Sequence, residues 1–219
     1  KNVKLIPIEM VVRGYISGVT NTSIWGSYQK GERIIYGIKF PDGLSKNQKL
    51  PTPVITPTTK AKSGHDERLT EKELLKKKIV TPAIWRQMKK TALELFERGT
   101  KICAKGGIIL VDTKYEFGLD SNGKLILIDE IHTPDSSRFW IKKTYKLRLK
   151  KGLEPDNFDK EFLRLLYAKK GYIGNGKPPK MPSVLANQLS TRYIQIYKKI
   201  TGKRLEKEVV SLRKLQIQI

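Results

Sequence analysis

The sequence lacks a second cysteine, a long apolar run and a balance of charge. Its one cysteine, Cys103, excludes an intramolecular disulfide and argues against metal binding by thiolates, so a reducing, cytoplasmic setting is expected. No apolar stretch approaches the roughly 20 residues that a membrane-spanning helix needs. The opening KNVKLIPIEM also lacks the apolar core of a secretory signal, so we predict no membrane partner.

Acidic residues are scarce beside basic ones: 21 Asp and Glu stand against 44 Lys and Arg, and the formal net charge is +23. This excess predicts attraction to polyanions, either nucleic acid or small substrates that carry phosphates and carboxylates. No RNP-type aromatic sequence or zinc-finger spacing accompanies the scattered lysines, so nucleic acid is the less favoured partner. A merely solvated, basic surface is a third interpretation.

The patterns that are present mix strand and helix and predict an α+β protein. Strands are expected over residues 6–16 and over the segments RIIYGIKF, GIILVDTKYEF and KLILIDEI. Between them, residues 45–69 are rich in proline and threonine and are expected to form a long irregular loop. A loop of that length is uncommon unless it is functional.

Helix starts are marked by capping signals. Thr70 to Glu73 forms a capping box, and Thr81 followed by proline predicts a second helix that ends at Gly106. Two later helices are expected: one capped by Asp156 or Asn157, and one ending at Gly202.

A polar row interrupts the segment DTKYEFG. In a strand, Asp112, Lys114 and Glu116 point to one face, and the residues between them point to the other: Val111, Thr113, Tyr115 and Phe117. The dipeptide Asn-Gly at 122–123 predicts a type I′ hairpin turn, which would place Glu116 directly opposite Asp129. Two facing carboxylates need a cation, which could be Lys114 or a divalent metal such as Mg²⁺. A salt-bridge ladder on an exposed sheet face is the alternative.

Five ordered blocks carry a family resemblance: PIEMVVRGY, LPTPVITPTTKA with GHDE, GIILVDTKYEFG, IDEIHTPDSSRFW and FDKEFLR. Together they resemble the signature blocks of SAICAR synthetases. The resemblance implies a lobed ATP-binding α+β fold, an antiparallel sheet with packed helices. It also implies an ATP-dependent ligase of purine biosynthesis that joins L-aspartate to carboxyaminoimidazole ribotide (CAIR) through an acyl phosphate, with Mg²⁺ and ATP as cofactors.

The same resemblance implies roles for individual residues. Glu116 and Asp129 match the Mg²⁺–ATP carboxylates, and Lys114 matches a catalytic lysine between nucleotide and ribotide. Asp112 is expected to orient Lys114 or to bind substrate, as a second catalytic residue.

Other positions match the ribotide site. Arg13 and Arg138 match arginines that hold the ribotide phosphate, although pairing of Arg13 with Glu9 is an alternative. Ser23 is the best match to a phosphate-binding serine, with Thr20 and Thr22 as substitutes. Lys60 and Asp66 match residues near the imidazole carboxylate and its metal, and His65 is interpreted as a loop hydrogen bond rather than a base.

Three parts are expected along the chain. Residues 1–44 would end an N-terminal lobe and carry the ribotide-phosphate loop, 45–202 would form the main substrate and Mg-ATP domain, and 203–219 an amphipathic tail. The glycine-containing lid over the ATP phosphates that the family implies is not among these 219 residues, so we expect further chain upstream and weak or absent ligase activity without it. A homo-oligomer is a further expectation. A degenerate ligase scaffold that binds nucleic acid is the alternative function.

Overall fold

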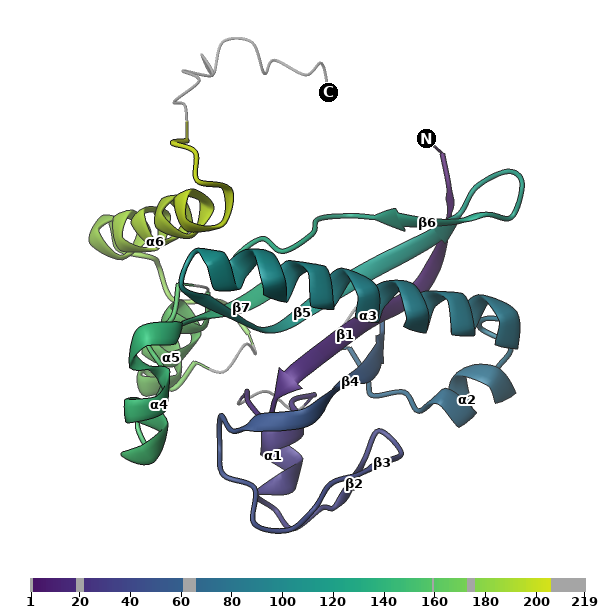
Figure 1. Ribbon diagram of the computed structural model, residues 1–219, viewed down its shortest axis with the longest axis horizontal. Helices are drawn as coiled ribbons and strands as arrows, with labels where there is room; N and C mark the ends of the chain where they lie inside the picture. Colours follow the sequence, from purple (N-terminus) through teal and green to yellow (C-terminus); the bar gives the residue numbers. More distant parts are fainter. Residues whose placement is uncertain (1, 19–21, 61–65, 159, 173–175, 206–219) are drawn as a thin grey trace.

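The computed structural model describes residues 2–18, 22–60, 66–158, 160–172 and 176–205 (Figure 1). Its centre is an antiparallel sheet in the order β4-β1-β5-β6, in which β7 also pairs with β5. The strands are β1 (Lys4–Tyr15), β4 (Lys49–Thr59), β5 (Ile108–Leu119), β6 (Leu125–Ile128) and β7 (Ser137–Ile141). The α+β architecture is thereby confirmed.

Helices pack around this sheet, and the longest, α3, runs along one face of β1 and β5 (Figure 1). The helices are α1 (Ile24–Tyr28), α2 (Glu71–Lys76), α3 (Pro82–Lys105), α4 (Lys142–Lys150), α5 (Glu161–Lys169) and α6 (Ser183–Thr201). No helix within the described ranges is long and apolar enough to span a membrane.

The sequence fixes the ends of α2 and α3 through their caps. The Thr70 hydroxyl accepts the Glu73 N–H at 3.2 Å and the Glu73 carboxylate accepts the Thr70 N–H, which is the predicted capping box. The Thr81 hydroxyl accepts the Ile84 N–H at 3.2 Å and so caps α3, Pro82 lies in the first turn, and Gly106 ends the helix. Both predicted helix starts are confirmed.

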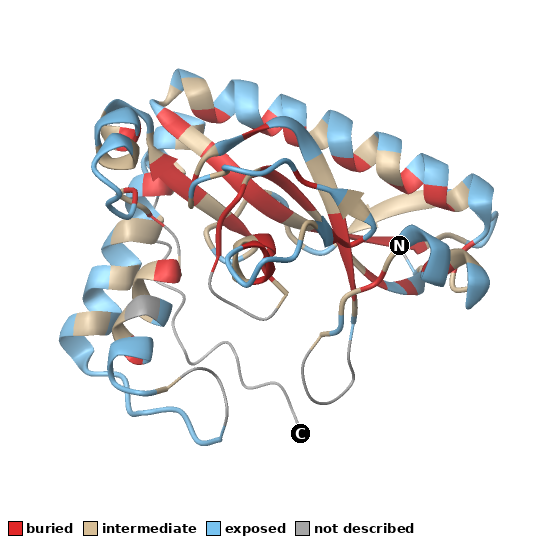
Figure 2. Ribbon diagram, turned by 90° about the horizontal axis from the view of Figure 1, so that it is seen from below, coloured by how far each residue is buried: buried red, intermediate tan, exposed pale blue. Residues whose placement is uncertain are grey.

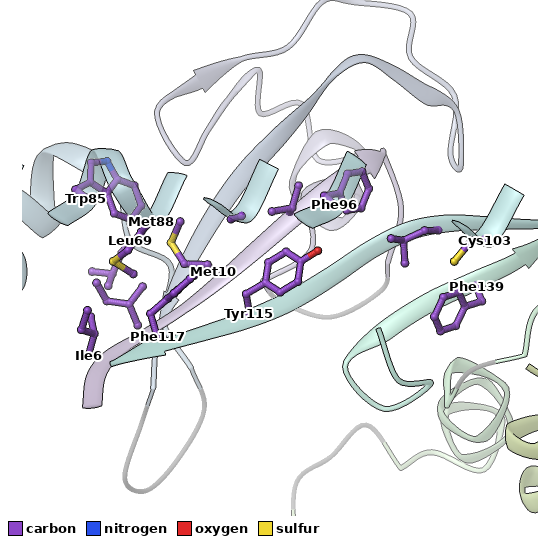
Figure 3. Packing of buried hydrophobic residues seen from close by; sticks show 14 of the residues in the cluster. Ile6, Met10, Leu69, Trp85, Met88, Phe96, Cys103, Tyr115, Phe117 and Phe139 are labelled. Carbon is purple, nitrogen blue, oxygen red and sulfur yellow. The ribbon is translucent and has the colours of Figure 1, made fainter. Parts of the chain in front are cut away.

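The core lies between α3 and one face of the sheet. Met10 of β1 and Tyr115 and Phe117 of β5 gather with Trp85 and Met88 of α3 (Figure 3). Buried positions of α3 face the strands, and exposed positions cover its outer side (Figure 2). Apolar residues on one side of these strands therefore leave the other side free for polar chemistry.

The expectation of an irregular segment over 45–69 is wrong, because residues 49–59 form the edge strand β4. Proline lacks the N–H of a ladder and is tolerated where that position faces away from the neighbouring strand. Pro57 stands opposite Met10, and its carbonyl accepts the Leu69 N–H at 3.0 Å, outside the β1–β4 ladder. The proline pattern that argued against a strand is thus typical of an edge.

The type I′ turn predicted at Asn122-Gly123 is also wrong. Asp120 pairs with Lys124 around a three-residue loop, in which Asp120 Oδ1 accepts the N–H groups of Asn122 and Lys124, both at 2.9 Å. Only Gly123 in this described loop has a positive φ, 73°. This side-chain cap adds one residue to the loop and shifts the register, so that Glu116 faces Ile128 instead of Asp129.

Two successive left-handed residues do occur elsewhere, at Tyr36 and Gly37, with φ of 58° and 75°. They connect β2 (Ile34–Ile35) to β3 (Ile38–Lys39), so the segment expected as one strand is a small hairpin.

The later helices follow the sequence less closely. The helix α4 was not expected, and α5 starts at Glu161 rather than beside Asp156, whose carboxylate instead accepts a hydrogen bond from Thr144 at 2.7 Å. The last helix is confirmed, because α6 ends at Thr201 and Gly202 takes the left-handed cap with φ of 70°. Most of the expected tail, 206–219, lies outside the described residues.

Candidate functional site

The site lies on the sheet face that α3 does not cover. The antiparallel register sets Glu9 opposite Glu116, Val11 opposite Lys114, and Arg13 opposite Asp112. Opposed residues share a face, so the polar row of β5 meets a second polar row on β1. The predicted common face of Asp112, Lys114 and Glu116 is consistent with this register.

Val111 departs from the expected alternation. The register of β5 with β7 shifts between Leu110 and Asp112, as at a β-bulge. Val111 consequently packs with Trp140 and Tyr145 rather than with Tyr115 and the main core.

Lys114 is the centre of a first cluster. Its ammonium contacts three carboxylates: Glu116 Oε1 at 2.5 Å, Glu9 Oε1 at 3.3 Å and Asp129 Oδ2 at 3.3 Å. Burial alone would lower the pKa of Lys114, but the hydrogen bond to Glu116 and the charges of Glu9 and Glu116 raise it above its ordinary value. Lys114 is therefore charged at neutral pH and holds the acids together.

Asp129 reaches this cluster by a route different from the predicted one. It follows the last residue of β6 and has a φ of 64°, so it belongs to a turn and not to the ladder. The turn, rather than cross-strand pairing, brings its carboxylate to Lys114. Lys114 likewise does not face Ile131 across a hairpin, because its N–H donates to the carbonyl of Ser136.

Lys60 closes the cluster from the other side. It directly follows β4, and its ammonium donates to Glu116 Oε2. Both oxygens of Glu116, a side chain only 3% exposed, are thus occupied by ammonium groups. The predicted grouping of Lys60, Lys114, Glu116 and Asp129 is present in the structure.

Glu9 was missed as a site residue. Its carboxylate also accepts a hydrogen bond from Thr58 at 3.2 Å, and burial raises its pKa, while Lys114 opposes that rise. The signal was available: Glu9 alternates with Arg13 on the same strand, and therefore shares its face. The alternative pairing of Arg13 with Glu9 is not what the structure shows.

Arg13 and Arg138 form a second cluster around Asp112. One oxygen of Asp112, Oδ2, accepts from Arg138 Nη1, lies 3.5 Å from Arg13 Nη1 and accepts from the Ser17 hydroxyl at 3.3 Å. Asp112 thus contacts both arginines, and its expected role of orienting Lys114 or binding substrate stays a prediction.

Each arginine has a further fixed contact. Arg13 Nε donates to Thr56 Oγ1 at 2.8 Å, and Arg138 Nη2 donates to Glu161 Oε2 at 3.3 Å. Burial lowers the pKa of Arg13, although the charge of Asp112 opposes this. Burial alone would raise the pKa of Glu161, but the charges of Arg138 and Arg164 lower it. The block FDKEFLR contained Glu161, but its contact with Arg138 depends on tertiary structure.

Ser23 lies beside this second cluster. It is buried, caps α1 and accepts the Gly26 N–H at 3.3 Å. A methyl group at Gly18 would lie 2.7 Å from Ser23 Cβ and 3.6 Å from Arg138 Nη2, so both residues flank Gly18. Thr22 offers its carbonyl to Arg13, while Thr20 and His65 lie outside the described residues.

The two clusters are neighbours, because Asp112 and Lys114 are two residues apart on β5, about 7 Å along the strand. A small cavity of about 20 Å³, room for about one water, adjoins the second cluster and is lined by Ser17, Gly18, Asn47, Arg138 and Glu161 among others. The charge of Asp66 contributes to the raised pKa of Glu9, so Asp66 lies near the first cluster. The metal-binding role expected of Asp66 stays a prediction.

The first cluster fits a divalent cation by its donor chemistry. Glu116 and Asp129 supply carboxylate oxygens around a position that an ammonium group occupies, and Mg²⁺ is commonly bound by one or two carboxylates together with phosphates and water. Within the described ranges no group of three or more His, Cys, Asp or Glu side chains forms a ready-made cage. Glu116 and Asp129 would therefore need further ligands, such as phosphate or water oxygens, to complete a metal site.

Known proteins resemble this chain in sequence and in fold. The family model described as SAICAR synthetase matches residues 1–179. The phosphoribosylaminoimidazole-succinocarboxamide synthase of Legionella pneumophila is 50% identical over 208 residues, which cover 92% of this chain and 65% of the relative. The chain thus spans slightly less than two thirds of that relative's length.

Solved structures of SAICAR synthetases resemble the fold of this chain. SAICAR synthase from Saccharomyces cerevisiae, complexed with SAICAR, is 33% identical with a TM-score of 0.76, over 94% of this chain and 63% of that one. A type-2 SAICAR synthetase in complex with ADP is 28% identical with a TM-score of 0.65, over 94% of this chain and 67% of that one. The sequence match, the shared fold and the two polar clusters lead to one assignment: the chain belongs to the SAICAR synthetase family.

Proposed function

We propose that this chain carries the ribotide-binding and nucleotide-binding core of a ligase that joins L-aspartate to CAIR, with ATP, to give SAICAR, ADP and phosphate. The observation that carries the proposal is the adjacency of a carboxylate–lysine cluster and a buried arginine pair on one sheet face. The SAICAR and ADP bound to the solved relatives support both ligand classes. Family membership favours this ligase over the nucleic-acid-binding alternative.

The second cluster would hold the ribotide phosphate. Arg13 and Arg138 present planar donor groups whose positions are fixed in advance by Asp112, so little side-chain entropy is lost when an anion binds. Ser23 would add a hydroxyl donor from the same side of Gly18. Asp112 would act as the residue that aims the arginines.

The first cluster would hold the reacting groups. In the reaction, a CAIR carboxylate oxygen forms a bond to the γ-phosphorus as ADP leaves; the aspartate amine then bonds to the acyl carbon, phosphate leaves and the amine gives up a proton. Lys114 and Lys60 would offset the negative charge that the two anionic reactants bring together. Mg²⁺ held by Glu116 and Asp129, with Asp66 as a further expected ligand, would neutralise phosphate charge when bound.

The net charge of +23 serves such a reaction, because all three substrates are anions and a basic protein raises their local concentration. The expected setting is the cytoplasm, where ATP is supplied. The predicted division at residues 44 and 202 stays a proposal; β1, from the first part, is a central strand of the main sheet.

Binding and turnover test this proposal separately. Calorimetric titration of the 219-residue chain with SAICAR should show binding that Arg138→Met weakens by about ten-fold or more, since a charged hydrogen-bonding group is lost. Arg33→Met, at an exposed pair with Asp42, is the matched control and should leave SAICAR affinity unchanged. Equal affinities for all three proteins would contradict the proposal.

Turnover is measured by ADP release in the presence of CAIR, L-aspartate and MgATP. We expect weak or absent release from the 219-residue chain and full release from a chain extended to the length of its relatives. Full turnover by the 219 residues alone would contradict the expected need for a phosphate lid.

A further inference from the structure

The proposed function leaves His132 without a role, although α3 and β5 enclose its side chain. The imidazole Nε2 lies 2.7 Å from the Tyr115 hydroxyl, and the two rings meet edge to face with centroids 5.7 Å apart. On the α3 side, a methyl group at position 99 would lie 2.3 Å from His132 Cε1. The ring therefore has room only because residue 99 is glycine.

His132 and Asp129 delimit one turn. Both have left-handed backbones, with φ of 54° and 64°, and only two residues separate them. Asp129 contacts Lys114, and His132 contacts Tyr115. Because Lys114 and Tyr115 are consecutive in β5, their side chains point to opposite faces of the sheet. The turn thus contacts β5 on both faces of the sheet, at the neighbouring residues Lys114 and Tyr115.

The backbone gives Asp129 little other restraint. The β5–β6 ladder ends at the pair Glu116 and Ile128, and β7 begins only at Ser137. Thr133 ties the far end of this segment to β7, because its carbonyl accepts the Ser137 N–H at 2.9 Å, and its hydroxyl contacts Glu130 within the segment. Between Ile128 and Thr133, the contact of the His132 side chain with Tyr115 joins the turn to the packed core.

We propose that His132, seated against Gly99 and hydrogen-bonded to Tyr115, is a positioning residue that holds the Asp129 carboxylate at Lys114. The effect that we expect on metal affinity rests on the proposed function. The placement of Asp129 is a property of the metal-free protein and can be measured there.

Tyr115→Phe removes the hydroxyl and keeps the ring, so it is the mildest test. In the metal-free chain we expect the carboxyl ¹³C resonance of Asp129 to move toward the position it has in Lys114→Met, where its partner is absent. We also expect affinity for Mn²⁺, used as the probe metal, to fall by about two- to ten-fold, the range that one hydrogen bond supports. Tyr145→Phe is the matched control, because its hydroxyl donates to the Asn47 carbonyl at 2.8 Å, on another part of the sheet.

Gly99→Ala tests the same contact from the helix. The added methyl must displace the imidazole, so we expect a larger loss of Mn²⁺ affinity than in Tyr115→Phe, despite the higher helix propensity of alanine. In a His132→Ala background the ring is gone, so adding Gly99→Ala should change nothing further. His132→Gln, which keeps a hydrogen-bonding group near Tyr115, should recover part of the affinity lost in His132→Ala.

Two results would overturn the inference. One is an unchanged Asp129 resonance in both Tyr115→Phe and Gly99→Ala. The other is Mn²⁺ affinity that falls equally in Tyr145→Phe, which would indicate general loosening of the fold. If the unaltered chain binds no Mn²⁺, the proposed metal role fails, whereas the Asp129 resonance still decides the positioning role of His132.

Discussion

The two polar clusters of the site share a sheet face but differ in how they are held. In the arginine cluster, the Arg13, Asp112 and Arg138 side chains are all about nine-tenths buried and each has at least two fixed partners. In the lysine cluster, Lys114 is 26% exposed and Asp129 is 43% exposed. The arginine cluster is therefore the more rigid of the two, and the lysine cluster is the more accessible to solvent.

Breaking the arginine cluster should have the largest effect on stability. Asp112→Asn removes the charge that compensates two buried guanidinium groups, so the free energy of unfolding should fall by about 3–5 kcal/mol. Urea unfolding monitored by circular dichroism measures it. Asp42→Asn, at an exposed pair with Arg33, should change stability by less than about 1 kcal/mol. Similar losses in both variants would contradict the description of the arginine cluster as rigid.

Acid should destabilise the protein in two stages, through His132 and then through Glu161. Burial lowers the pKa of His132 to about 4, below its ordinary 6.5, so the unfolded chain takes up a proton first as pH falls. Stability contributed by neutral His132 is therefore lost between pH 6.5 and about 4, by about 3 kcal/mol in total. Glu161, with its lowered pKa, loses its contribution only below its unfolded value, at about pH 4.

Unfolding of His132→Leu over the same range isolates this contribution. The variant should lose less stability between pH 6.5 and 4 than the unaltered chain, because it has no imidazole to protonate. Parallel stability profiles for the two proteins would show that His132 does not act as a buried neutral group.

Removing Lys114 should have the smallest effect of the three. Lys114→Met should lower the free energy of unfolding by about 1–2 kcal/mol, since Lys60 still pairs with Glu116. The pKa of Glu9, already raised by burial, should rise further, because the opposing charge is lost. Carboxyl ¹³C titration measures the pKa, and Lys101→Met, at an exposed helix pair with Glu97, should leave it unchanged.

Alternation predicted the polar row of β5 because a strand places every second side chain on one face whatever its partners. The same rule applied to β1 would have added Glu9. The bond between Arg138 and Glu161 could not be predicted from spacing, because 23 residues separate them and only the packing of α5 brings them together. Their meeting depends on tertiary structure.

Local sequence patterns gave wrong predictions where they left out the surroundings of a residue. Asn-Gly predicts a two-residue turn, but the carboxylate of Asp120 accepts two N–H groups and stabilises a longer loop. The prolines of residues 45–69 argued for an irregular segment because proline interrupts the ladder of an interior strand, whereas β4 lies at the edge of the sheet. In each case the residue types were known and their surroundings were not.

The three-residue loop before β6 determines how β6 is aligned with β5. The strand reads Leu-Ile-Leu-Ile, all four residues are half-buried, and so hydrophobicity does not distinguish one face from the other. Where both faces are equally apolar, only the turn fixes the alignment of a strand. If one residue of this loop were deleted, β6 could still pair with β5, but with the register shifted by one residue. The shift would move Asp129 away from Lys114. The length of a surface loop thereby sets the alignment on which the carboxylate cluster depends.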